Sequence, residues 1–392
     1  MFIVKLLVAL GLLPALLVPT YSHAAPLYTV SQFLDNFVAF DINNAGQMAG
    51  SLVQSDGYTH AALYDNGVFR DAGTFGGIAS FATAVNDAGA LTGTFFDGIG
   101  GARGFLYSDG VATDLGQGVD GYGINARGDV VGRTANGDGT YSPFLYSAGT
   151  LTRLGYLGFG NDATAFDVND AGQVVGFSNT RAGPDANYHP FLYGDGRLQD
   201  LGTFNDTGYS TAGAINNAGH VAGNSDGWGG VAHAFIYENG ALTDLGSFGG
   251  FLEVNGMNEQ GTFVGTAATP DFVLLGYIYR DKVLVDLNTL IDPALGLHIE
   301  RATAINDSGQ IAAYGCREAI CGAVRLDLAS AVPEPGAAWL LLPGVVMMSG
   351  VRRWQGRRRK KAASPCGCGG FSMLQRWNYA SRPARLRSFS FR

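Results

Sequence analysis

A single pattern of apolar and polar positions recurs along the chain between residues 26 and 330. The most complete copies read as an apolar stretch ending in Ile-Asn or Val-Asn, an Asn/Asp-x-Gly turn, a short apolar stretch ending in Gly, a Phe-Leu-Tyr stretch and Asp-Leu-Gly. Alternating apolar residues bounded by Gly, Asn and Asp are typical of short β-strands joined by tight turns. Each copy therefore predicts four strands.

The fifth copy illustrates the prediction. Its strands are expected at 210–215, 220–223, 233–237 and 241–245, and Asn-Asn-Ala-Gly at 216–219 forms the first turn. Asn accepts hydrogen bonds from its own turn and Gly tolerates positive φ, so this sequence favours a type I turn with a G1 bulge. Alternation within Phe-Leu-Tyr places apolar side chains on both faces of the sheet. Each sheet should therefore be packed between two others.

The length of the repeat limits the number of possible architectures. The spacings between the leading asparagines are 43, 39, 44, 47, 42 and 48 residues, which is the range of propeller blades and longer than most solenoid repeats. The glycine three residues further on is present in every copy. The seven asparagines are Asn43, Asn86, Asn125, Asn169, Asn216, Asn258 and Asn306.

The seventh copy indicates how the array ends. It has the Asn306 turn and strands at 310–313 and 323–325, but no Asp-Leu-Gly follows them. The missing fourth strand is present at the other end of the repeat region, where residues 27–30 precede the first copy. A split last repeat closes a ring and removes open sheet edges. We therefore predict an all-β, seven-bladed β-propeller closed by an N-terminal strand, with a β-solenoid or two stacked sandwiches as alternatives.

The repeats resemble the HAF family of extracellular repeats, named for a His-Ala-Phe step. The step is present as His233-Ala234-Phe235, and His60 and His189 occupy the same place in two other copies. Arg103, Ser142 and Leu275 replace the histidine elsewhere. The resemblance covers residues 27–328 and implies an exported protein, but it implies almost nothing about activity.

Both ends of the chain have the composition of targeting segments. Residues 1–25 contain Lys5, an apolar stretch at 6–18 and small residues near Ala24, which together predict a cleaved secretory signal peptide. An uncleaved anchor is the alternative. The C-terminal segment 331–361 contains an apolar stretch at 337–351, expected to cross a membrane as one helix with the help of flanking residues. Basic residues follow it, which places the body of the protein on the outer side.

The C-terminal segment resembles the PEP-CTERM sorting signal. The resemblance rests on Val332-Pro333-Glu334-Pro335, the apolar stretch and a basic cluster of Arg352, Arg353, Arg357, Arg358 and Arg359. It implies a Gram-negative bacterium, an exosortase as processing partner, a transient membrane anchor and release to the cell surface or extracellular matrix. The chain departs from this pattern by continuing to Arg392. We interpret 362–392 as a disordered tail, because it has no acidic residue and no apolar periodicity. Cys366 and Cys368 are candidates for a lipid or a metal, but two cysteines alone make a poor site for a metal.

Charge excludes one class of partner. Residues 26–328 contain 12 Lys and Arg and 32 Asp and Glu, a net charge near −20, whereas the whole chain carries −8. A body this acidic repels nucleic acid and anionic lipid. Nucleic-acid binding is therefore excluded.

The candidate chemical groups mostly repeat with the unit. His60, His189 and His233 belong to copies that are not all neighbours, so they are expected to cap an edge or pack on the next blade rather than bind one metal. Repeating aspartates hold each blade together in this interpretation; they are Asp71, Asp114, Asp200, Asp244 and Asp286. No nucleophile elbow, zinc-binding His-Glu-x-x-His or phosphate-binding glycine loop occurs.

Two further features of the sequence are candidate sites. Acid-containing segments at 54–57, 136–139 and 224–227 are expected at matching positions between strands two and three, where calcium is a weak possibility because no Asp-x-Asp-x-Asp run is present. We therefore expect no cofactor and no dedicated metal site. Cys316 and Cys321 flank the corresponding turn of the seventh copy and should form a disulfide outside the cytoplasm.

Two functions remain open from the sequence. The first is a non-enzymatic surface or matrix protein whose rigid ring presents irregular loops to an exopolysaccharide or a surface protein. The longest insert, 179–188, contains Arg181, Asp185 and Asn187 and is the candidate binding loop. The alternative is an exported carbohydrate-active enzyme with acidic residues from different blades at the mouth of the channel.

Overall fold

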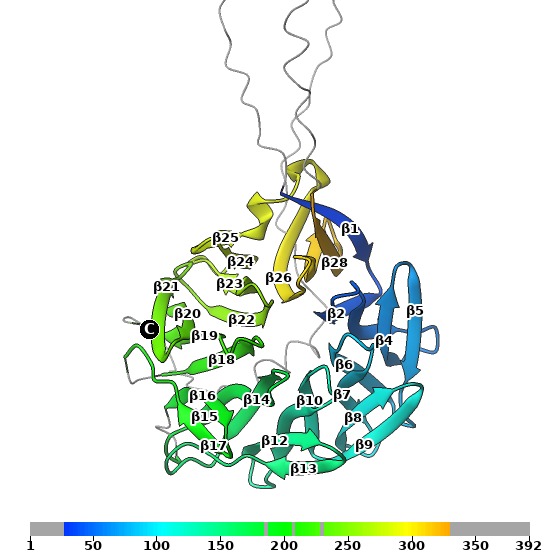
Figure 1. Ribbon diagram of the computed structural model, residues 1–392. Coiled ribbons are helices and arrows are strands. Elements are labelled where there is room, and N and C mark those ends of the chain that lie inside the picture. The colour runs from blue at the N-terminus through cyan, green and yellow to red at the C-terminus, as the bar shows by residue number, and fades with distance from the viewer. Residues whose placement is uncertain (1–26, 184–186, 206–207, 228–230, 330–392) are drawn as a thin grey trace, which may run out of the picture.

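The computed structural model describes residues 27–183, 187–205, 208–227 and 231–329. These residues form seven four-stranded antiparallel units arranged around a centre, the arrangement of a β-propeller (Figure 1). A single parallel bridge, between Thr59 and Ala79, joins the first two units into one eight-stranded sheet. The predicted signal peptide, the sorting signal with its membrane helix, and the tail lie outside the described residues. Within the described ranges, none of the helices has the length and apolar character needed to cross a membrane.

Each sheet, or blade, follows the chain from the centre of the ring to its outer edge (Figure 1). Blade 1 contains β2 (Phe37–Ile42), β3 (Met48–Val53), β4 (Thr59–Asp65) and β5 (Val68–Gly73). Blade 2 contains β6 (Ala79–Val85), β7 (Leu91–Phe96), β8 (Ala102–Ser108) and β9 (Val111–Gln117). Blade 3 contains β10 (Val119–Ile124), β11 (Val130–Ala135), β12 (Tyr141–Ser147) and β13 (Thr150–Arg153).

The remaining blades follow the same order. Blade 4 contains β14 (Ala163–Val168), β15 (Val174–Asn179), β16 (Tyr188–Gly194) and β17 (Arg197–Asp200). Blade 5 contains β18 (Ser210–Ile215), β19 (Val221–Asp226), β20 (Ala232–Glu238) and β21 (Ala241–Gly246). Blade 6 contains β22 (Leu252–Met257), β23 (Phe263–Ala268), β24 (Leu274–Arg280) and β25 (Val283–Asp286). Two short 3-10 helices, η1 (Leu287–Thr289) and η2 (Pro293–Leu295), lead to blade 7.

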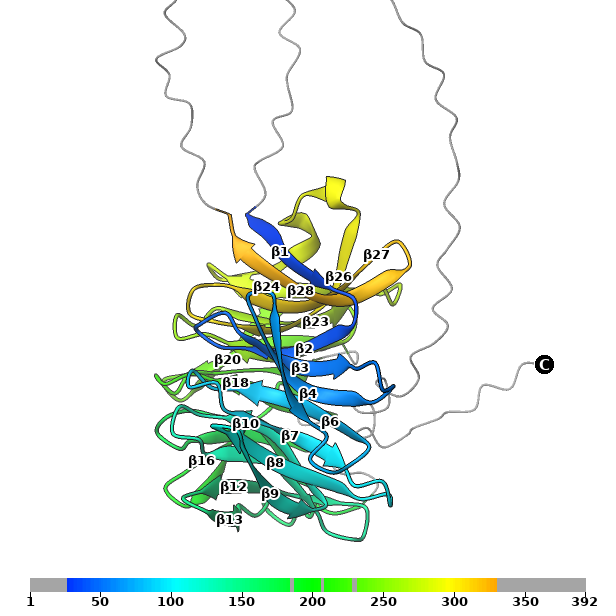
Figure 2. The ribbon, with the colours of Figure 1, turned by 90° about the vertical axis from the view of Figure 1, so that its right-hand side faces the viewer.

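Blade 7 is built from both ends of the described chain. Its strands β26 (Leu297–Ile305), β27 (Ile311–Arg317) and β28 (Ile320–Leu328) are joined by β1 (Tyr28–Leu34) as the outermost strand. β1 runs antiparallel to β28, with Tyr28 opposite Leu328 and Leu34 opposite Ala323. The fourth strand predicted from the split repeat is therefore confirmed, and it closes the ring (Figures 1 and 2).

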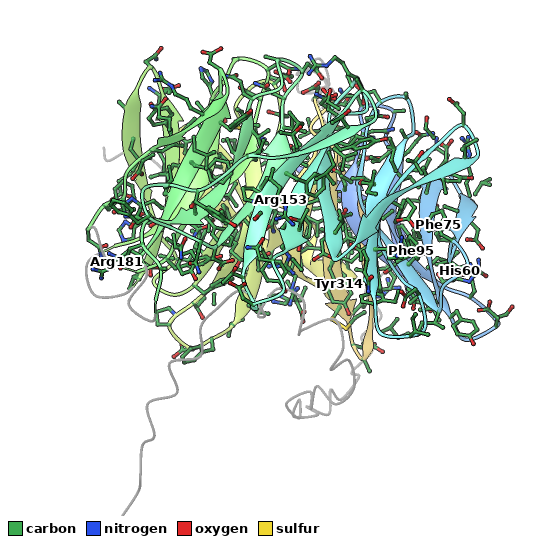
Figure 3. The ribbon with its side chains drawn as sticks, turned by 90° about the horizontal axis from the view of Figure 1, so that it is seen from below. His60, Phe75, Phe95, Arg153, Arg181 and Tyr314 are labelled. Atoms are coloured by element: carbon green, nitrogen blue, oxygen red, sulfur yellow. A yellow bond between two sulfur atoms is a disulfide. The ribbon has the colours of Figure 1, made fainter. Side chains whose placement is uncertain are left out.

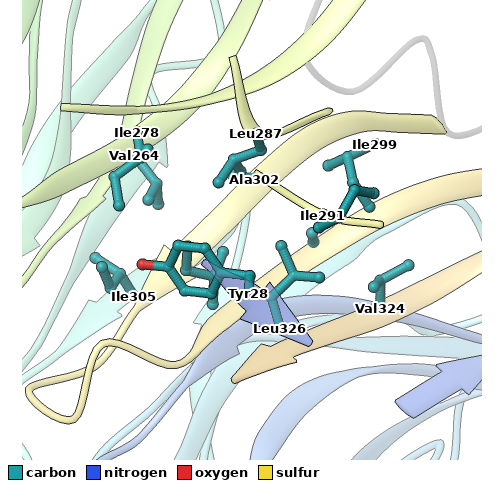
Figure 4. Close-up of a cluster of buried hydrophobic side chains, with 12 residues drawn as sticks. Tyr28, Val264, Ile278, Leu287, Ile291, Ile299, Ala302, Ile305, Val324 and Leu326 are labelled. Carbon is teal, nitrogen blue, oxygen red and sulfur yellow. The ribbon is translucent and has the colours of Figure 1, made fainter. Parts of the chain in front are cut away.

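The closing strand also supplies core residues. Tyr28, which is 2% exposed, packs in a cluster between blades 6 and 7 that includes Ile278, Ile305 and Leu326 (Figure 4). Burial of an aromatic side chain of this size stabilises a fold by about 2 to 3 kcal/mol. β1 is thus held by packing as well as by its backbone ladder.

Every blade has the same irregularity between its first and second strands. The register shifts by one residue, at Ala39/Asp41 in blade 1 and at the equivalent place in the other six. A second glycine of the repeat, Gly50 in blade 1, lies in strand two beside this bulge. The bulge brings the backbone oxygen of Val38 in strand one so close that a Cβ on Gly50 would overlap it. Our prediction that strand two ends at this glycine was wrong. The glycine lies inside the strand, as Gly223 does within Val221–Asp226.

The leading asparagines link each blade to the next. In blade 1, Asn43 Oδ1 accepts the backbone N–H groups of Ala45 and Gln47, which fixes the turn, and Gly46 has the expected positive φ of 77°. Its Nδ2 donates 3.1 Å to the backbone oxygen of Asn86 in blade 2. The same inter-blade bond recurs from Asn86, Asn125, Asn169 and Asn258, and Asn306 donates 2.9 Å to the oxygen of Asn43.

One blade interface lacks this bond. Asn216 Nδ2, between blades 5 and 6, is the only buried side-chain nitrogen or oxygen without a partner in the described part of the chain. Four of the other asparagines also donate Nδ2 to the residue four positions on, which is Gln47, Asp129, Gln173 or Gln310. In blade 5 this position is His220, which does not supply that acceptor. The asparagine ring is therefore closed across six interfaces and interrupted at one.

This interruption provides a matched pair of substitutions. Asn306→Ala removes two donated bonds and leaves the N–H groups of Ser308 and Gln310 without their acceptor, so we expect it to lower the free energy of unfolding by about 2 to 4 kcal/mol. Asn216→Ala removes only the acceptor of the His220 N–H and should cost about 1 kcal/mol. Urea denaturation of both variants measures the difference. Equal losses would show that the inter-blade bond contributes little.

Candidate functional site

The connections between strands divide the ring into two different faces. The asparagine turns and the hairpins between strands three and four lie on one face, which we call the turn face. The loops between strands two and three, and the crossings between blades, lie on the other, which we call the loop face. β1 begins and β28 ends on the turn face (Figure 2), and the residues that flank these two ends, Leu27 and Ala329, are joined by a backbone hydrogen bond. The loop face is therefore opposite to the point where the chain leaves the ring.

The histidines of the His-Ala-Phe step do not converge. Each binds the aspartate of Asp-Leu-Gly in its own blade, eleven residues later. The Nδ1 atoms of His60, His189 and His233 lie 2.9, 2.8 and 3.0 Å from the nearest oxygens of Asp71, Asp200 and Asp244. The histidines thus pair with the outermost strand of their own blade, at an edge as expected, and not with the next blade.

Blade 2 keeps the same arrangement with an arginine in place of the histidine. Arg103 Nε donates 2.9 Å to Asp114, again eleven residues later. In all four blades the second oxygen of the aspartate accepts the N–H of the glycine two positions on, such as Gly116. The pair thus ties strand three to the crossing that leaves strand four. These aspartates hold their blades together, as predicted, although the sequence reasoning missed their partners.

The acid-containing segments considered for calcium are not equivalent. Asp56 and Asp138 lie in turns, and each accepts the N–H two residues on, from Tyr58 and Thr140. Asp226 instead ends strand β19, and its carboxylate accepts the N–H of Tyr209. The predicted match at 224–227 was wrong, because the bulged strand extends three residues beyond Gly223. Within the described residues, no group of three or more His, Cys, Asp or Glu side chains has the spacing to hold a metal.

Two aspartates, which occur at one position of the repeat in blades 1 and 4 only, are partly buried on the innermost strands. Asp41 accepts the N–H of Ile42 and the N–H of Val85 in blade 2, both at 2.8 Å. Asp167 makes the same pair of bonds to Val168 and to Ile215 in blade 5. Burial raises the pKa of Asp41 to about 7 and also raises that of Asp167, against the lowering effect of these donors. Both carboxylates bridge neighbouring blades and have no oxygen free of a donor.

A second belt of polar groups surrounds the turn face, one residue beyond the asparagines. The N–H of Glu259 donates to Asp307, that of Asp307 to Asn44 and that of Asn44 to Asp87, at 2.8 to 2.9 Å. Burial raises the pKa of Glu259, and the nearby Asp307 and Asp170 raise it further. The acids of this face are therefore also used to join blades.

Blade 3 contains a buried ion pair with no counterpart in the other blades. Arg133 Nε donates 2.9 Å to Asp120, and both side chains are less than a tenth exposed. The guanidinium lies 3.9 Å from the centre of the Tyr141 ring, close enough for a cation–π contact. Removing one partner would leave an unpaired buried charge, so this pair acts as a structural unit.

The candidate binding loop is only partly described. Arg181 forms an isolated bridge with Phe159, and the oxygen of Asn187 accepts the N–H of Thr180 at 3.1 Å. Asp185 lies outside the described residues. Figure 3 places Arg181 at the opposite side of the ring from His60. The structure therefore places this loop far from His60, although the loop leads directly into β16 and its His189.

The loop face carries several exposed apolar side chains. Ile99, Phe159 and Phe272 are 93%, 90% and 89% exposed. Phe272 has φ 61° in a turn where Gly57 occupies the same place in blade 1. A left-handed conformation costs an aromatic residue about 1 to 2 kcal/mol, so its exposure there needs a reason other than stability. No sequence period predicted these positions.

The seventh blade contains the remaining sequence-predicted pair. Cys316 and Cys321 are joined by a disulfide, with their Sγ atoms 2.05 Å apart. The two residues are opposite each other on β27 and β28, at the hairpin on the loop face. The bond encloses the shortest of the loops between strands two and three, next to the closing seam of the ring.

Known proteins resemble this chain only distantly. No protein-family model matches it, and no curated protein matches it in sequence. TolB from Acinetobacter baumannii aligns with 60% of this chain and 61% of its own length, at 14% identity and a TM-score of 0.43. The β-propeller domain of the Trilobed protease from Pyrococcus furiosus aligns with 65% of this chain and 82% of its own, at 10% identity and a TM-score of 0.46.

A puromycin-hydrolyzing peptidase from Mycobacterium tuberculosis aligns with 78% of this chain and 55% of its own, at 12% identity and a TM-score of 0.46. This chain thus spans less than two thirds of both TolB and the peptidase. These likenesses concern the fold and bring no activity to this chain.

The histidine–aspartate pairs predict a pH dependence. Burial alone would raise the pKa of Asp200, but the bonds from His189 and from the Gly202 N–H together lower it. A carboxyl whose pKa is lower in the folded state stabilises the fold above its unfolded pKa, near 3.9, and loses this effect as the pH falls through the folded value. Asp200→Asn should therefore destabilise the protein most above pH 5. Thermal melting from pH 3 to 7 tests this, and a constant difference would contradict it.

Proposed function

We propose that the protein is an exported, non-enzymatic component of the cell surface or extracellular matrix, in which the rigid ring presents its loop face to a glycan or protein partner. The main support is the distribution of polar and apolar side chains over the ring. The repeating Asn, Asp and His side chains form bonds within or between blades, whereas the irregular and exposed groups, such as Phe272 and Ile99, belong to the loop face. Binding is expected where the loops vary.

The geometry of the chain ends agrees with this proposal. The described chain leaves the ring at Ala329 on the turn face. If 331–361 serves as the PEP-CTERM signal that its sequence resembles, an exosortase cuts near Pro333 and the segment anchors the protein only before cleavage. The loop face then points away from the membrane during processing. Membership of the HAF family, proposed from the His-Ala-Phe steps, fits the same extracellular setting.

The alternative function is that of an exported carbohydrate-active enzyme. It is favoured by two carboxylates on the innermost strands of blades 1 and 4, Asp41 and Asp167, since glycoside cleavage needs a pair of acids. Each of their oxygens, however, accepts a backbone N–H across or beside a blade interface. A catalytic acid or nucleophile needs an oxygen that reaches the substrate. The non-enzymatic function is therefore the better supported of the two.

The form purified from culture medium should bind extracted exopolysaccharide without cleaving it. Co-sedimentation measures binding, and assays for reducing ends and unsaturated products measure turnover. New ends that vanish in Asp167→Asn would establish the enzyme instead. The mass spectrum of the same preparation should place the C-terminus near Pro333 to Pro335, and a form that still carries Arg352 would contradict processing by an exosortase.

A further inference from the structure

Blade 2 contains a hollow that opens at its outer edge. The hollow has a volume of about 190 Å³ and is lined by Phe75, Phe95, Phe105, Ala112, Thr113 and Asp114. Its walls are aromatic: the ring centre of Phe75 lies 4.4 Å from that of Phe105 and 5.7 Å from that of Phe95. Figure 3 shows Phe75 and Phe95 next to each other on this side of the ring.

The hollow exists because one position of the repeat has lost its large side chain. In β9, Ala112 lies opposite Tyr107. The equivalent residue opposite the tyrosine of strand three is large and apolar in blades 1, 3, 4, 5 and 6, where it is Phe69, Leu151, Leu198, Leu242 and Leu284. Those side chains are partly buried against the core of their own blade interface. Ala112 is exposed and leaves this space empty.

The other blades therefore show what fits the hollow. Four of them place a leucine there and one a phenylalanine, so the space accepts one aliphatic or aromatic side chain. The polar group at the mouth is already paired, because Asp114 accepts from Arg103 and from the Gly116 N–H. A hollow of this size is smaller than the 300 to 1,000 Å³ typical of sites for drug-sized ligands. It suits a single anchoring side chain better than a whole molecule.

The edge beside the hollow is suited to an extended segment. β9 is the outermost strand of blade 2, and within the described residues it pairs only with β8. It has seven residues, whereas β13, β17 and β25 have four. The unpaired N–H and C=O groups of such an edge can form a ladder with an added strand.

We propose that the outer edge of blade 2 docks an extended segment of a partner protein, whose backbone pairs with β9 and whose leucine-sized side chain occupies the hollow. The ladder supplies affinity, and the hollow supplies selectivity for the side chain. This site lies on the outer edge of blade 2 and does not depend on the partner proposed for the loop face.

The chain itself provides a probe for the test. The peptide Gly-Thr-Leu-Thr-Arg copies residues 149–153, whose leucine fills the equivalent space in blade 3, and Gly-Thr-Ala-Thr-Arg is the control peptide. Binding of each labelled peptide to the purified full chain is measured by fluorescence anisotropy. We expect the leucine peptide to bind at least ten times more tightly than the alanine peptide.

Two variants locate the binding. Ala112→Leu fills the hollow and should weaken binding of the leucine peptide at least tenfold without unfolding the ring, while exopolysaccharide binding stays unchanged. Leu242→Ala opens the equivalent space in blade 5 and should add a second binding site. Unchanged binding to Ala112→Leu would overturn the proposal. Binding of the peptide to Leu242→Ala but not to the unchanged protein would also overturn it, because the hollow of blade 2 would then already be covered. A third contradicting result is that Ala112→Leu loses glycan binding and keeps peptide binding.

Discussion

The ring depends on one interaction that only asparagine can make. At the head of each repeat, the carboxamide oxygen accepts a backbone N–H of the turn, and in every repeat except that of Asn216 the nitrogen of the same group donates to the backbone of the next blade. Aspartate has the acceptors but no donor, and serine or threonine cannot supply two acceptors and a donor with this reach. Because Asn306 donates to Asn43, the series returns to its start. The turn of each blade is thereby coupled to the position of its neighbour.

This coupling explains why so much of the polar surface is structural. Asp41 and Asp167 each add a carboxylate bridge at one blade interface. The belt through Asn44 and Asp307 adds further hydrogen bonds between blades on the turn face. The interruption at Asn216 leaves the junction of blades 5 and 6 with less polar bonding than the others. The seam in blade 7 is different, because it combines a backbone ladder with the burial of Tyr28. The joint between the chain ends is therefore not the least bonded place in the ring.

Periodicity was enough to predict the blades and their closure, because turns and strand ends depend on local residue types. The strand predicted at 210–215 coincides with β18, and the missing fourth strand was identified from its absence after Arg325. The bulge was not predictable in this way, because the glycine at position 223 signals the approach of another strand and not a strand end. The extension of β19 to Asp226 follows from it.

The candidate sites were less predictable, because they depend on contacts between repeats and on departures from the repeat. The His–Asp pairs had a readable signal, since His60, His189 and His233 each precede an aspartate by eleven residues. The hollow also had a signal in the sequence, because Ala112 stands where the other complete repeats have leucine or phenylalanine. The inter-blade role of Asp41 and Asp167 had no signal in the sequence, because nothing in one strand shows that a backbone N–H of the next blade lies within reach.

β1 and β28, from the two ends of the described chain, close the seven blades into a single ring that should unfold cooperatively. Hydrogen–deuterium exchange of the native protein, followed by peptide mass spectrometry, tests this closure. If β1 belongs to the ring, the amides of Tyr28–Leu34 should exchange as slowly as those of β28 and lose protection together with the blades as urea is added. Rapid exchange of β1 while the seven blades stay protected would contradict closure by this strand.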